Sequence, residues 1–371
     1  MKLVMIGHGM VGHKFIEAIL EKADDELEIT ILAEEPRIAY DRVHLTEYFS
    51  GKSAKDLSLA RFDFADAHGI DLRLNTKAIA IDSAAQTVTT SLGDVIRYDK
   101  LVMATGSYAF VPPISGNDRE NCFVYRTIED LDAIRAASIN SKTGVVIGGG
   151  LLGLEAAKAL RDLNLETHVV EFAPRLMAVQ IDDLGGKVLR RKIENLGVKV
   201  HTQKATSSIE AGTEATHVMK FADGSELETD IILFSAGIRP RDELARSSGL
   251  ALGERGGIKI NDYCQTSDDN IYAIGECALW DNKIYGLVAP GYDMARIAAK
   301  HIVEEETHSF AGADMSTKLK LMGVDVASVG DAHGVTPNSL SYFYADEDAF
   351  VYKKIVVDAD KTKLLGAVLV G

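Results

Sequence analysis

Two short segments of the 371-residue chain carry glycines at the spacing G-x-G-x-x-G. The two triplets are Gly7, Gly9 and Gly12, and Gly148, Gly150 and Gly153. In each triplet the first glycine permits a tight turn, the second lets the backbone approach a phosphate, and the third lets a helix pack closely on a strand. The N-terminus of the following helix then presents N–H groups and a positive dipole to an anion. The repeat therefore predicts two loops that bind dinucleotide pyrophosphates, whereas one copy would leave a plain glycine-rich turn as a serious alternative.

An acidic residue ends the second apolar run after each triplet: Glu34 follows EITILA and Glu171 follows THVV. A carboxylate at this position of a βαβ unit accepts hydrogen bonds from ribose hydroxyls. In the second unit it would also repel a 2′-phosphate, which favours NADH over NADPH. Arg175 lies near enough in the sequence to support such a phosphate, so NADPH stays open. The alternative for either glutamate is a solvated strand end.

Two dinucleotide loops in one chain predict a hydride donor and a bound acceptor, which are NAD(P)H and FAD. The flavin accepts the hydride and can release its electrons singly or in pairs, so this chemistry requires no catalytic acid or base from the protein. We therefore interpret His8, His13 and His44 as packing or loop residues. A nucleotide-binding regulatory or structural module without turnover is the alternative from a different functional class.

The three cysteines are Cys122, Cys264 and Cys277, with no CxxC pair and no Cys/His spacing typical of metal ligands. They predict neither a disulfide scaffold nor a zinc or iron–sulfur site. A disulfide reductase of this architecture would carry its redox thiol early in the first domain, where no cysteine occurs, so thiol chemistry is not expected. The low cysteine content fits a reducing compartment, and without a signal-peptide core or a long apolar stretch it predicts a cytoplasmic protein.

Charge and composition narrow the choice of partners. The chain has 55 acidic and 40 basic residues, which gives a formal net charge of −15. Such a surface repels nucleic-acid phosphates and anionic lipids, so we expect neither a nucleic-acid partner nor a membrane partner. A hydrophobic content of 46% with only 7 prolines excludes a disordered or low-complexity chain.

Regular elements must place the glycines and acids at one edge of a sheet. Apolar runs that stop at a glycine or an acid predict parallel strands over 3–6, 28–33, 101–104, 167–170, 231–234 and 270–274. Apolar residues at helical spacing predict a helix after each glycine triplet. Polar alternation with turn signals predicts antiparallel meanders over 76–98 and 203–228.

These elements predict an α/β fold with two Rossmann-like dinucleotide-binding domains. The FAD-binding domain is expected to be discontinuous, over 1–110 and 236–305, with the NAD-binding domain at 111–235 between its two parts. Residues 306–371 alternate as strands do over 318–330 and finish in an apolar strand-type run. They predict the start of a third, α+β C-terminal interface domain that is truncated.

With GHGMVG, EEPRIAYDR, MATGS, GGGLLGLE, GIRP and IYAIGE in this order, the sequence resembles the pyridine nucleotide-dependent flavoprotein reductases. YDRVHLTEYF, CFVYRTIEDL and INDYCQTSDDNIYAIGECA are similar to the large subunits of bacterial NADH-dependent nitrite reductases. The resemblance covers the whole chain. It implies an FAD-dependent NADH oxidoreductase that passes electrons to iron–sulfur and sirohaem centres absent from these residues. A stand-alone NADH-dependent rubredoxin or ferredoxin reductase is the alternative.

Carried over position by position, the resemblance implies two sets of cofactor contacts. The FAD contacts are Gly7, Gly9, Met10, Val11, Gly12, Glu34, Arg42, Thr105, Gly106, Gly275 and Glu276. The NADH contacts are Gly148, Gly150, Leu152, Gly153, Glu155, Glu171 and Gly237, with Glu155 near the nicotinamide. Glu47 would lie near the flavin where many ferredoxin reductases have a lysine, so their flavin potential and acceptor do not transfer. The implied acceptor is a set of downstream metal-containing domains or a small electron-transfer protein, and a homodimer is an open expectation.

Overall fold

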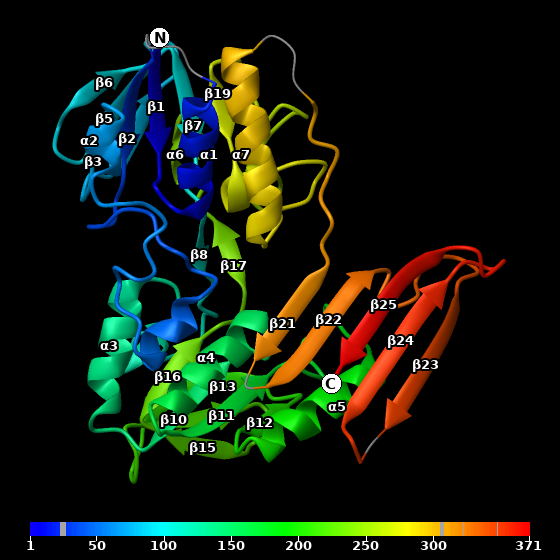
Figure 1. Ribbon diagram of the computed structural model, residues 1–371. Coiled ribbons are helices and arrows are strands. Elements are labelled where there is room, and N and C mark those ends of the chain that lie inside the picture. The colour runs from blue at the N-terminus through cyan, green and yellow to red at the C-terminus, as the bar shows by residue number, and fades with distance from the viewer. Residues whose placement is uncertain (23–26, 305–307, 322, 347) are drawn as a thin grey trace. The chain divides into compact units, whose positions relative to one another are not determined.

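The computed structural model describes residues 1–22, 27–304, 308–321, 323–346 and 348–371 (Figure 1). Contacts within the chain divide it into two compact units. Unit 1 comprises Met1–His44, Ser53–Tyr108 and Ile238–Asp314, and unit 2 comprises Leu45–Lys52, Ala109–Gly237 and Met315–Gly371. Each unit contains a five-stranded parallel sheet, which confirms the predicted α/β class with two Rossmann-like parts.

The parallel sheet of unit 1 has the strand order β19-β7-β1-β2-β3. Its strands are β1 (Lys2–Ile6), β2 (Glu28–Leu32), β3 (Asp71–Arg73), β7 (Lys100–Met103) and β19 (Ile271–Ala273). Four of the predicted strands are confirmed here to within one residue at each end, whereas β3 was not predicted. The central strands β1 and β7 are almost wholly buried, as expected for parallel strands covered on both faces.

Helices α1 (Met10–Leu20) and α7 (Val288–Val303) lie side by side in unit 1 (Figure 1). Phe15, Ile16 and Ile19 on α1 are completely buried, and burial of each such side chain contributes about 1.5–3 kcal/mol. A glycine permits the close helix contact, because a Cβ at Gly291 would lie 2.5 Å from Cγ2 of Val11. The shorter elements of this unit are α2 (Phe64–Ala67), α6 (Glu243–Ser247), η2 (Gly275–Cys277), β17 (Ile238–Pro240), β18 (Ile258–Lys259) and β20 (Ala278–Leu279). Strand β8 (Ser107–Ala109) contains the point at which the chain passes from unit 1 to unit 2.

Both predicted meanders are confirmed as three-stranded antiparallel sheets. The meander of unit 1 consists of β4 (Ala78–Asp82), β5 (Thr87–Thr90) and β6 (Val95–Arg97). The meander of unit 2 consists of β13 (Thr206–Ala211), β14 (His217–Phe221) and β15 (Glu226–Thr229). In both, the alternation of polar and apolar residues gives each sheet one buried face.

The parallel sheet of unit 2 has the strand order β12-β11-β10-β16-β9. Its strands are β9 (Cys122–Val124), β10 (Thr143–Ile147), β11 (Glu166–Glu171), β12 (Lys199–Thr202) and β16 (Ile231–Phe234). Its helices are α3 (Ile128–Ser138), α4 (Leu151–Asp162) and α5 (Asp183–Asn195). The outer strands β9 and β12 were not predicted, because neither has a long apolar run.

A short 3-10 helix, η1 (Leu45–Ser50), packs in unit 2 although its neighbours in the sequence belong to unit 1. The Tyr48 hydroxyl donates a 2.5 Å hydrogen bond to Asp132. The Arg135 guanidinium donates to the Tyr48 carbonyl at 2.6 Å and lies 4.3 Å from the centre of the Tyr48 ring. This cation–π contact and the hydrogen bonds fix η1 on α3, a placement that no local sequence pattern indicates.

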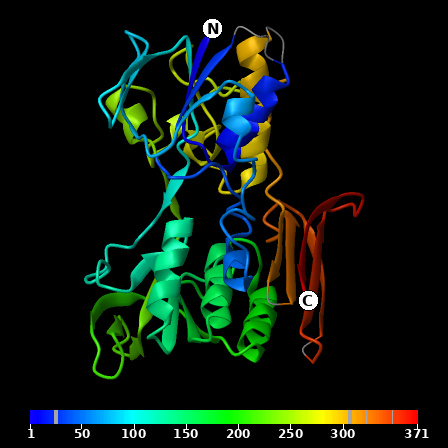
Figure 2. The ribbon, with the colours of Figure 1, turned by 60° about the vertical axis from the view of Figure 1, so that its left-hand side comes forward.

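The C-terminal part of unit 2 is a five-stranded antiparallel sheet with the order β21-β22-β25-β24-β23. Its strands are β21 (Thr317–Leu321), β22 (Val324–Gly330), β23 (Leu340–Asp346), β24 (Val351–Val357) and β25 (Leu364–Val370). The strands predicted over 318–330 are confirmed, apart from residue 322, which lies outside the described residues. Figure 2 shows these strands, coloured orange to red, beside the green α5, which contacts β22, β24 and β25.

Asp182 connects this sheet to α5. Its carboxylate caps α5 by accepting the Gly185 N–H at 3.0 Å, and it also accepts the Tyr352 hydroxyl at 2.7 Å. The Lys354 ammonium lies 3.0 Å from the same carboxylate, and its side chain is only 8% exposed. Burial by itself would raise the pKa of Asp182, but the hydrogen bonds from Gly185, Tyr352 and Lys354 outweigh it, so the pKa lies below its ordinary value.

We expect Asp182→Asn to lower the free energy of unfolding by about 2–4 kcal/mol at neutral pH, because Lys354 would stay buried without its counter-charge. A carboxyl group with a depressed pKa stabilises the fold above its ordinary pKa, and the contribution is lost as the pH falls. The difference between wild type and variant should therefore shrink below a pH of about 4. Urea unfolding at several pH values measures it.

Asp183→Asn is the matched control, because this neighbouring carboxylate is 77% exposed and pairs with Arg175 at the surface. It should cost less than about 1 kcal/mol. Equal effects of the two substitutions would contradict the role given to Asp182.

Candidate dinucleotide-binding sites

The first glycine loop connects β1 to α1 at the carboxyl edge of the unit 1 sheet. Gly7 has a φ of +99°, and a Cβ at this position would lie 2.3 Å from the carbonyl oxygen of Ala104 on the neighbouring chain segment. A Cβ at Gly12 would lie 2.5 Å from the carbonyl oxygen of Gly7. The chain's own backbone therefore excludes a side chain at both positions.

The second glycine loop repeats this geometry between β10 and α4 in unit 2. Gly148 has a φ of +118°, and a Cβ there would lie 2.2 Å from the carbonyl oxygen of Ser235. A Cβ at Gly153 would lie 1.9 Å from the carbonyl oxygen of Gly148. The first and third glycines of both triplets thus have the same structural role.

The middle glycines, Gly9 and Gly150, differ from the other two in each loop. Their φ angles of −90° and −80° are open to any residue, and no described protein atom lies within 4 Å of a Cβ built on either. Neither backbone conformation nor packing within the described chain requires glycine there. Open space beside a helix N-terminus fits a pyrophosphate that approaches the backbone closely.

The N-termini of the helices support this assignment. Thr127 caps α3 and Asp182 caps α5, each by accepting a backbone N–H. Helices α1 and α4 have no side-chain cap and no acidic residue in the first turn, and the same is true of α7, which follows no glycine triplet. An anion bound at either loop would satisfy these N–H groups and interact favourably with the helix dipole.

Most of the other predicted FAD contacts gather at the carboxyl ends of β1, β7 and β19, which are neighbours in the unit 1 sheet. The Arg42 N–H donates to Sδ of Met10 at 3.2 Å, which brings residue 42 to the first turn of α1. The Arg42 guanidinium forms an ion pair with Glu35. Val11 packs against Gly275, whose φ of +77° and close approach favour glycine.

Ser107 and Arg241 are parts of this site that the sequence reading missed. The Ser107 hydroxyl donates to the Glu276 carboxylate at 2.6 Å. The Thr105 hydroxyl donates to the carbonyl oxygen of Arg241 at 2.7 Å, and the Arg241 N–H donates to that of Gly106 at 2.9 Å. These bonds hold the turn after β7. In the sequence, only the position of Ser107 directly after Thr105 and Gly106 could have indicated that it belongs to this site.

Glu34 lies just beyond β2 and is about half exposed. Its carboxylate is 2.8 Å from the Arg241 guanidinium and 3.3 Å from the Lys77 ammonium. Burial alone would raise the pKa of Glu34, but the charges and hydrogen bonds of Arg241 and Lys77 outweigh it, so the pKa lies below its ordinary value. The carboxylate is therefore ionised at neutral pH, and a ribose hydroxyl would share it with two cations.

Glu171, at the end of β11, is held by backbone groups instead. Its carboxylate accepts the Gly149 N–H at 2.5 Å and the Ala173 N–H at 2.6 Å. These two bonds tie the end of the strand to the second glycine loop. The Arg175 guanidinium is engaged elsewhere: it donates to the carbonyl oxygen of Ile181 at 3.0 Å and pairs with Asp183 at 2.6 Å.

The remaining predicted NADH contacts flank the same loop. Leu152 lies half exposed in the first turn of α4 and Glu155 follows on the same helix, whereas Gly237 has a φ of +105° with open space at its Cβ position. Ser235, which the sequence reading missed, supplies the carbonyl oxygen that crowds Gly148.

Glu47, predicted near the flavin, lies in η1 in unit 2, where its carboxylate forms an ion pair with Lys52. The adjacent Thr46 hydroxyl accepts a 3.1 Å hydrogen bond from Tyr125. Burial first, and then the negative charge of Glu155, raise the pKa of Tyr125. Glu47 and Glu155 therefore belong to the same unit, and their nearness to flavin and nicotinamide stays a prediction.

The histidines behave as packing and loop residues. His8 and His13 are buried with ring centres 5.6 Å apart, and His13 packs edge-on against Phe64. Burial, and then the proximity of His13, lower the pKa of His8 to about 4, so His8 is neutral at physiological pH. His44 is an exposed loop residue that pairs with Asp41 at 2.7 Å.

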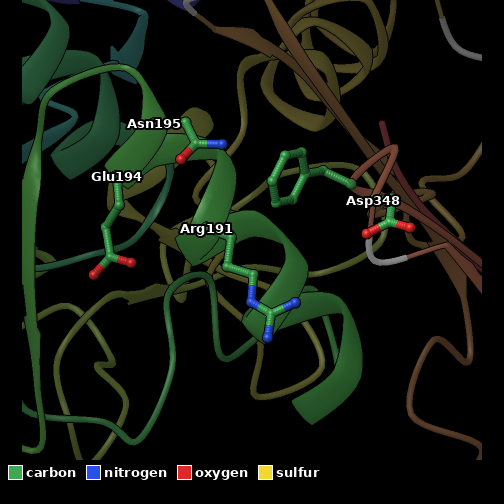
Figure 3. Close-up of a pocket in the computed structure, with 5 residues that line it drawn as sticks. Arg191, Glu194, Asn195 and Asp348 are labelled. Atoms are coloured by element: carbon green, nitrogen blue, oxygen red, sulfur yellow. The ribbon is translucent and has the colours of Figure 1, made fainter.

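Unit 2 has a surface pocket of about 430 Å³ that no residue of either glycine loop lines (Figure 3). Arg191, Glu194 and Asn195 at the end of α5 line it, together with Asp348 and Phe350 from the turn between β23 and β24. Its lining mixes both charges. Because it contains neither a helix N-terminus nor a glycine loop, we do not assign it to a dinucleotide.

The sequence pattern of one protein family, described as pyridine nucleotide-disulphide oxidoreductase, matches residues 1–302. The chain belongs to this family. A second pattern, the rubredoxin NAD+ reductase C-terminal domain, matches residues 316–371, which contain the antiparallel sheet of unit 2.

Within the family, the chain is 58% identical over 372 residues to the nitrite reductase (NADH) large subunit of Escherichia coli strain K12, covering 100% of this chain and 44% of that protein. It is 30% identical over 334 residues to the rubredoxin-NAD(+) reductase of Alcanivorax borkumensis, covering 90% of this chain and 86% of that protein. The solved structure of an NAD-dependent persulfide reductase from A. fulgidus matches this chain with a TM-score of 0.90 at 26% identity. The match covers 100% of this chain and 74% of that one. The chain spans less than half the length of the nitrite reductase subunit.

The family is named for disulphides, but the three thiols of this chain are free and lie in unfavourable surroundings for thiolate chemistry. Burial raises the pKa of Cys122 to about 11, and it also raises those of the fully buried Cys264 and Cys277. A neutral, buried thiol is a poor nucleophile. That electrons do not pass through cysteine stays a prediction.

The described residues contain neither a candidate metal site nor a membrane-spanning helix. No group of three or more His, Cys, Asp or Glu side chains there is placed to hold a metal ion. In the same part of the chain, every helix is too short or too polar to cross a membrane.

Because the middle glycine faces open space and the third faces a carbonyl oxygen, we expect a glycine-to-alanine substitution to affect the stability of the protein differently at the two positions. In Gly9→Ala the methyl group enters open space, so flavin-free protein should lose less than about 1 kcal/mol of stability. In Gly12→Ala the methyl group overlaps the Gly7 carbonyl oxygen, which should cost at least about 2 kcal/mol. Urea unfolding of the flavin-free protein tests both.

Flavin absorbance per mole of purified protein provides the second measurement. We expect Gly9→Ala to retain little FAD although it folds, because the methyl group occupies the space for the pyrophosphate. Full flavin content in Gly9→Ala, or wild-type stability in Gly12→Ala, would contradict the geometry described for this loop.

Proposed function

We propose that this chain binds FAD at the first glycine loop and NADH at the second, and that it passes electrons from NADH through the flavin to a redox partner. One observation carries the proposal: Gly9 and Gly150 leave open space at two uncapped helix N-termini, where nothing in the described chain requires glycine. Family membership supports a flavin and a nicotinamide cofactor.

The residues of unit 1 would hold FAD by charge and hydrogen bonding. The N–H groups of α1 bind the pyrophosphate, and the Arg42 backbone N–H bonds to Met10 in the first turn of this helix. The Glu276 carboxylate, which accepts the Ser107 hydroxyl, would also accept hydroxyl groups of the flavin side chain. Bound FAD supplies the hydride acceptor and the one-electron chemistry, while the protein binds and orients it.

The residues of unit 2 would hold the nicotinamide dinucleotide in the same manner. Helix α4 binds its pyrophosphate, and Glu171 accepts a ribose hydroxyl from a position that Gly149 and Ala173 fix. We propose NADH rather than NADPH, because the Glu171 carboxylate repels a 2′-phosphate and Arg175 is engaged by Ile181 and Asp183.

The similarity to the nitrite reductase (NADH) large subunit supports the identity of the reaction as electron input to nitrite reduction. In this proposal the electron acceptors are the iron–sulfur and sirohaem centres that the resemblance implies. We also propose that the protein acts in the cytoplasm. A stand-alone rubredoxin or ferredoxin reductase is less favoured, because the identity to rubredoxin-NAD(+) reductase is 30% against 58%. A regulatory module without turnover is also less favoured, because the proposed FAD and NADH sites together would bind a hydride donor and an acceptor. We also propose that the chain forms a homodimer.

The domain boundaries are proposed together with the function. Residues 1–110 and 236–305 would bind FAD, 111–235 would bind NADH, and 306–371 would form an interface domain. The boundary at residues 305–307 lies outside the described residues.

We expect the FAD-loaded chain to lose its flavin absorbance when NADH is added without oxygen, and to reduce ferricyanide with NADH. It should leave nitrite unchanged, because the proposal assigns nitrite reduction to the redox partner. Absorbance spectra and a nitrite assay measure these reactions. A flavin that NADH does not reduce would refute the proposal, and nitrite turnover by this chain would refute the assignment of the acceptor to a partner.

We expect Glu171→Ala to weaken NADH binding by about 1–2 kcal/mol, because one charge-assisted hydrogen bond to the ribose is lost. Binding of NADPH should weaken less or improve, because the repulsion of its phosphate is removed. Titration calorimetry gives both dissociation constants. Glu226→Ala, at an exposed glutamate on β15, is the control, and equal NADH affinities of the two variants would remove the ribose role of Glu171.

A further inference from the structure

Phe172 is an exposed aromatic residue next to the second candidate site. It follows Glu171 at the end of β11 and is 78% exposed. Leu152, in the first turn of α4, is also exposed to solvent. Large apolar side chains gain free energy when they leave water. The position of Phe172 beside a predicted ligand site, rather than its exposure alone, makes the ring a candidate contact for a bound ligand.

The backbone around Phe172 is fixed by hydrogen bonds on both sides. The Glu171 carboxylate accepts the Ala173 N–H at 2.6 Å and the Gly149 N–H at 2.5 Å. The carbonyl oxygen of Glu171 accepts the Lys204 N–H at 3.0 Å, and that of Ala173 accepts the Gln203 N–H at 3.1 Å. Phe172 is thus an exposed ring on an anchored backbone, which lowers the entropy cost of binding through it.

The chemistry of the neighbouring acid identifies the occupant. If Glu171 accepts a ribose hydroxyl, the base attached to that ribose lies within reach of the adjacent residue, because neighbouring Cα atoms are about 3.8 Å apart. Aromatic side chains bind nucleobases by stacking on their faces. In a nicotinamide dinucleotide, the base on this half of the molecule is adenine.

We propose that Phe172 stacks on the adenine of the nicotinamide dinucleotide and contributes affinity for the ADP half of the ligand. This inference rests on the proposed NADH site. It makes Phe172 a binding residue for the purine, distinct from the hydride-transferring end of the molecule.

The test measures binding of AMP, ADP-ribose and nicotinamide mononucleotide to the FAD-loaded chain by titration calorimetry. FAD must be present so that adenine does not enter the flavin site. We expect Phe172→Ala to bind AMP and ADP-ribose about tenfold more weakly, with unchanged binding of nicotinamide mononucleotide. Phe172→Trp should restore the affinity, because it retains an aromatic face.

Phe62→Ala is the matched control, because Phe62 is 89% exposed in unit 1 and lies outside both glycine loops. It should change none of the affinities. Adenine absorbance gives an independent readout: stacking reduces it on binding to wild type and Phe172→Trp, but not to Phe172→Leu. Unchanged unfolding midpoints will show that the substitutions leave the fold intact.

The outcomes separate this inference from the function on which it rests. Wild-type protein that binds no ADP-ribose would overturn the proposed NADH site and this inference with it. Binding of ADP-ribose that is equally tight in wild type and Phe172→Ala would overturn the inference alone. The latter result, combined with slower electron delivery to an acceptor protein, would identify Phe172 as a protein-contact residue instead.

Discussion

The crossing of a glycine backbone over a neighbouring carbonyl oxygen determines both candidate sites. Gly7 meets Ala104 in unit 1, and Gly148 meets Ser235 in unit 2, at distances that leave no room for a Cβ atom. Each crossing lets the chain turn from a central strand directly into a helix whose third glycine packs on the first. The helix N-terminus consequently lies at the carboxyl edge of the sheet, where its unsatisfied N–H groups are available to an anion.

The two loops share this geometry but differ in how the following acid is used. Glu34 lies between two cations, Arg241 and Lys77, which keep it ionised and share its oxygens. Glu171 is bonded to the N–H groups of Gly149 and Ala173, so its position is coupled to the loop itself. The two acids therefore offer a ligand different environments, one shared with cations and the other fixed by backbone N–H groups.

Unit 2 depends on contacts between residues far apart in the sequence. Asp182 caps α5 and also accepts hydrogen bonds from Tyr352 and Lys354, so one carboxylate serves a helix and the C-terminal sheet. Arg135 similarly holds η1 through the Tyr48 ring and carbonyl oxygen. Because η1 carries Thr46 and Glu47, this contact brings two more polar residues to the unit that contains Glu155.

The sequence by itself determined the two glycine loops, the central strands on either side of them, both meanders and the α/β class. These features follow from local rules, because a glycine triplet and an apolar run require only their neighbours to take effect. The short outer strands β3, β9 and β12, the position of η1, and the partners Ser107, Ser235 and Arg241 were decided only in the tertiary structure. Each depends on which segment packs beside it, and a side chain or carbonyl oxygen carries no local mark of a partner that is distant in the sequence. The spacing of the triplet assigned different roles to Gly9 and Gly12, but only the folded backbone supplies the open space at Gly9 and the carbonyl oxygen that crowds Gly12.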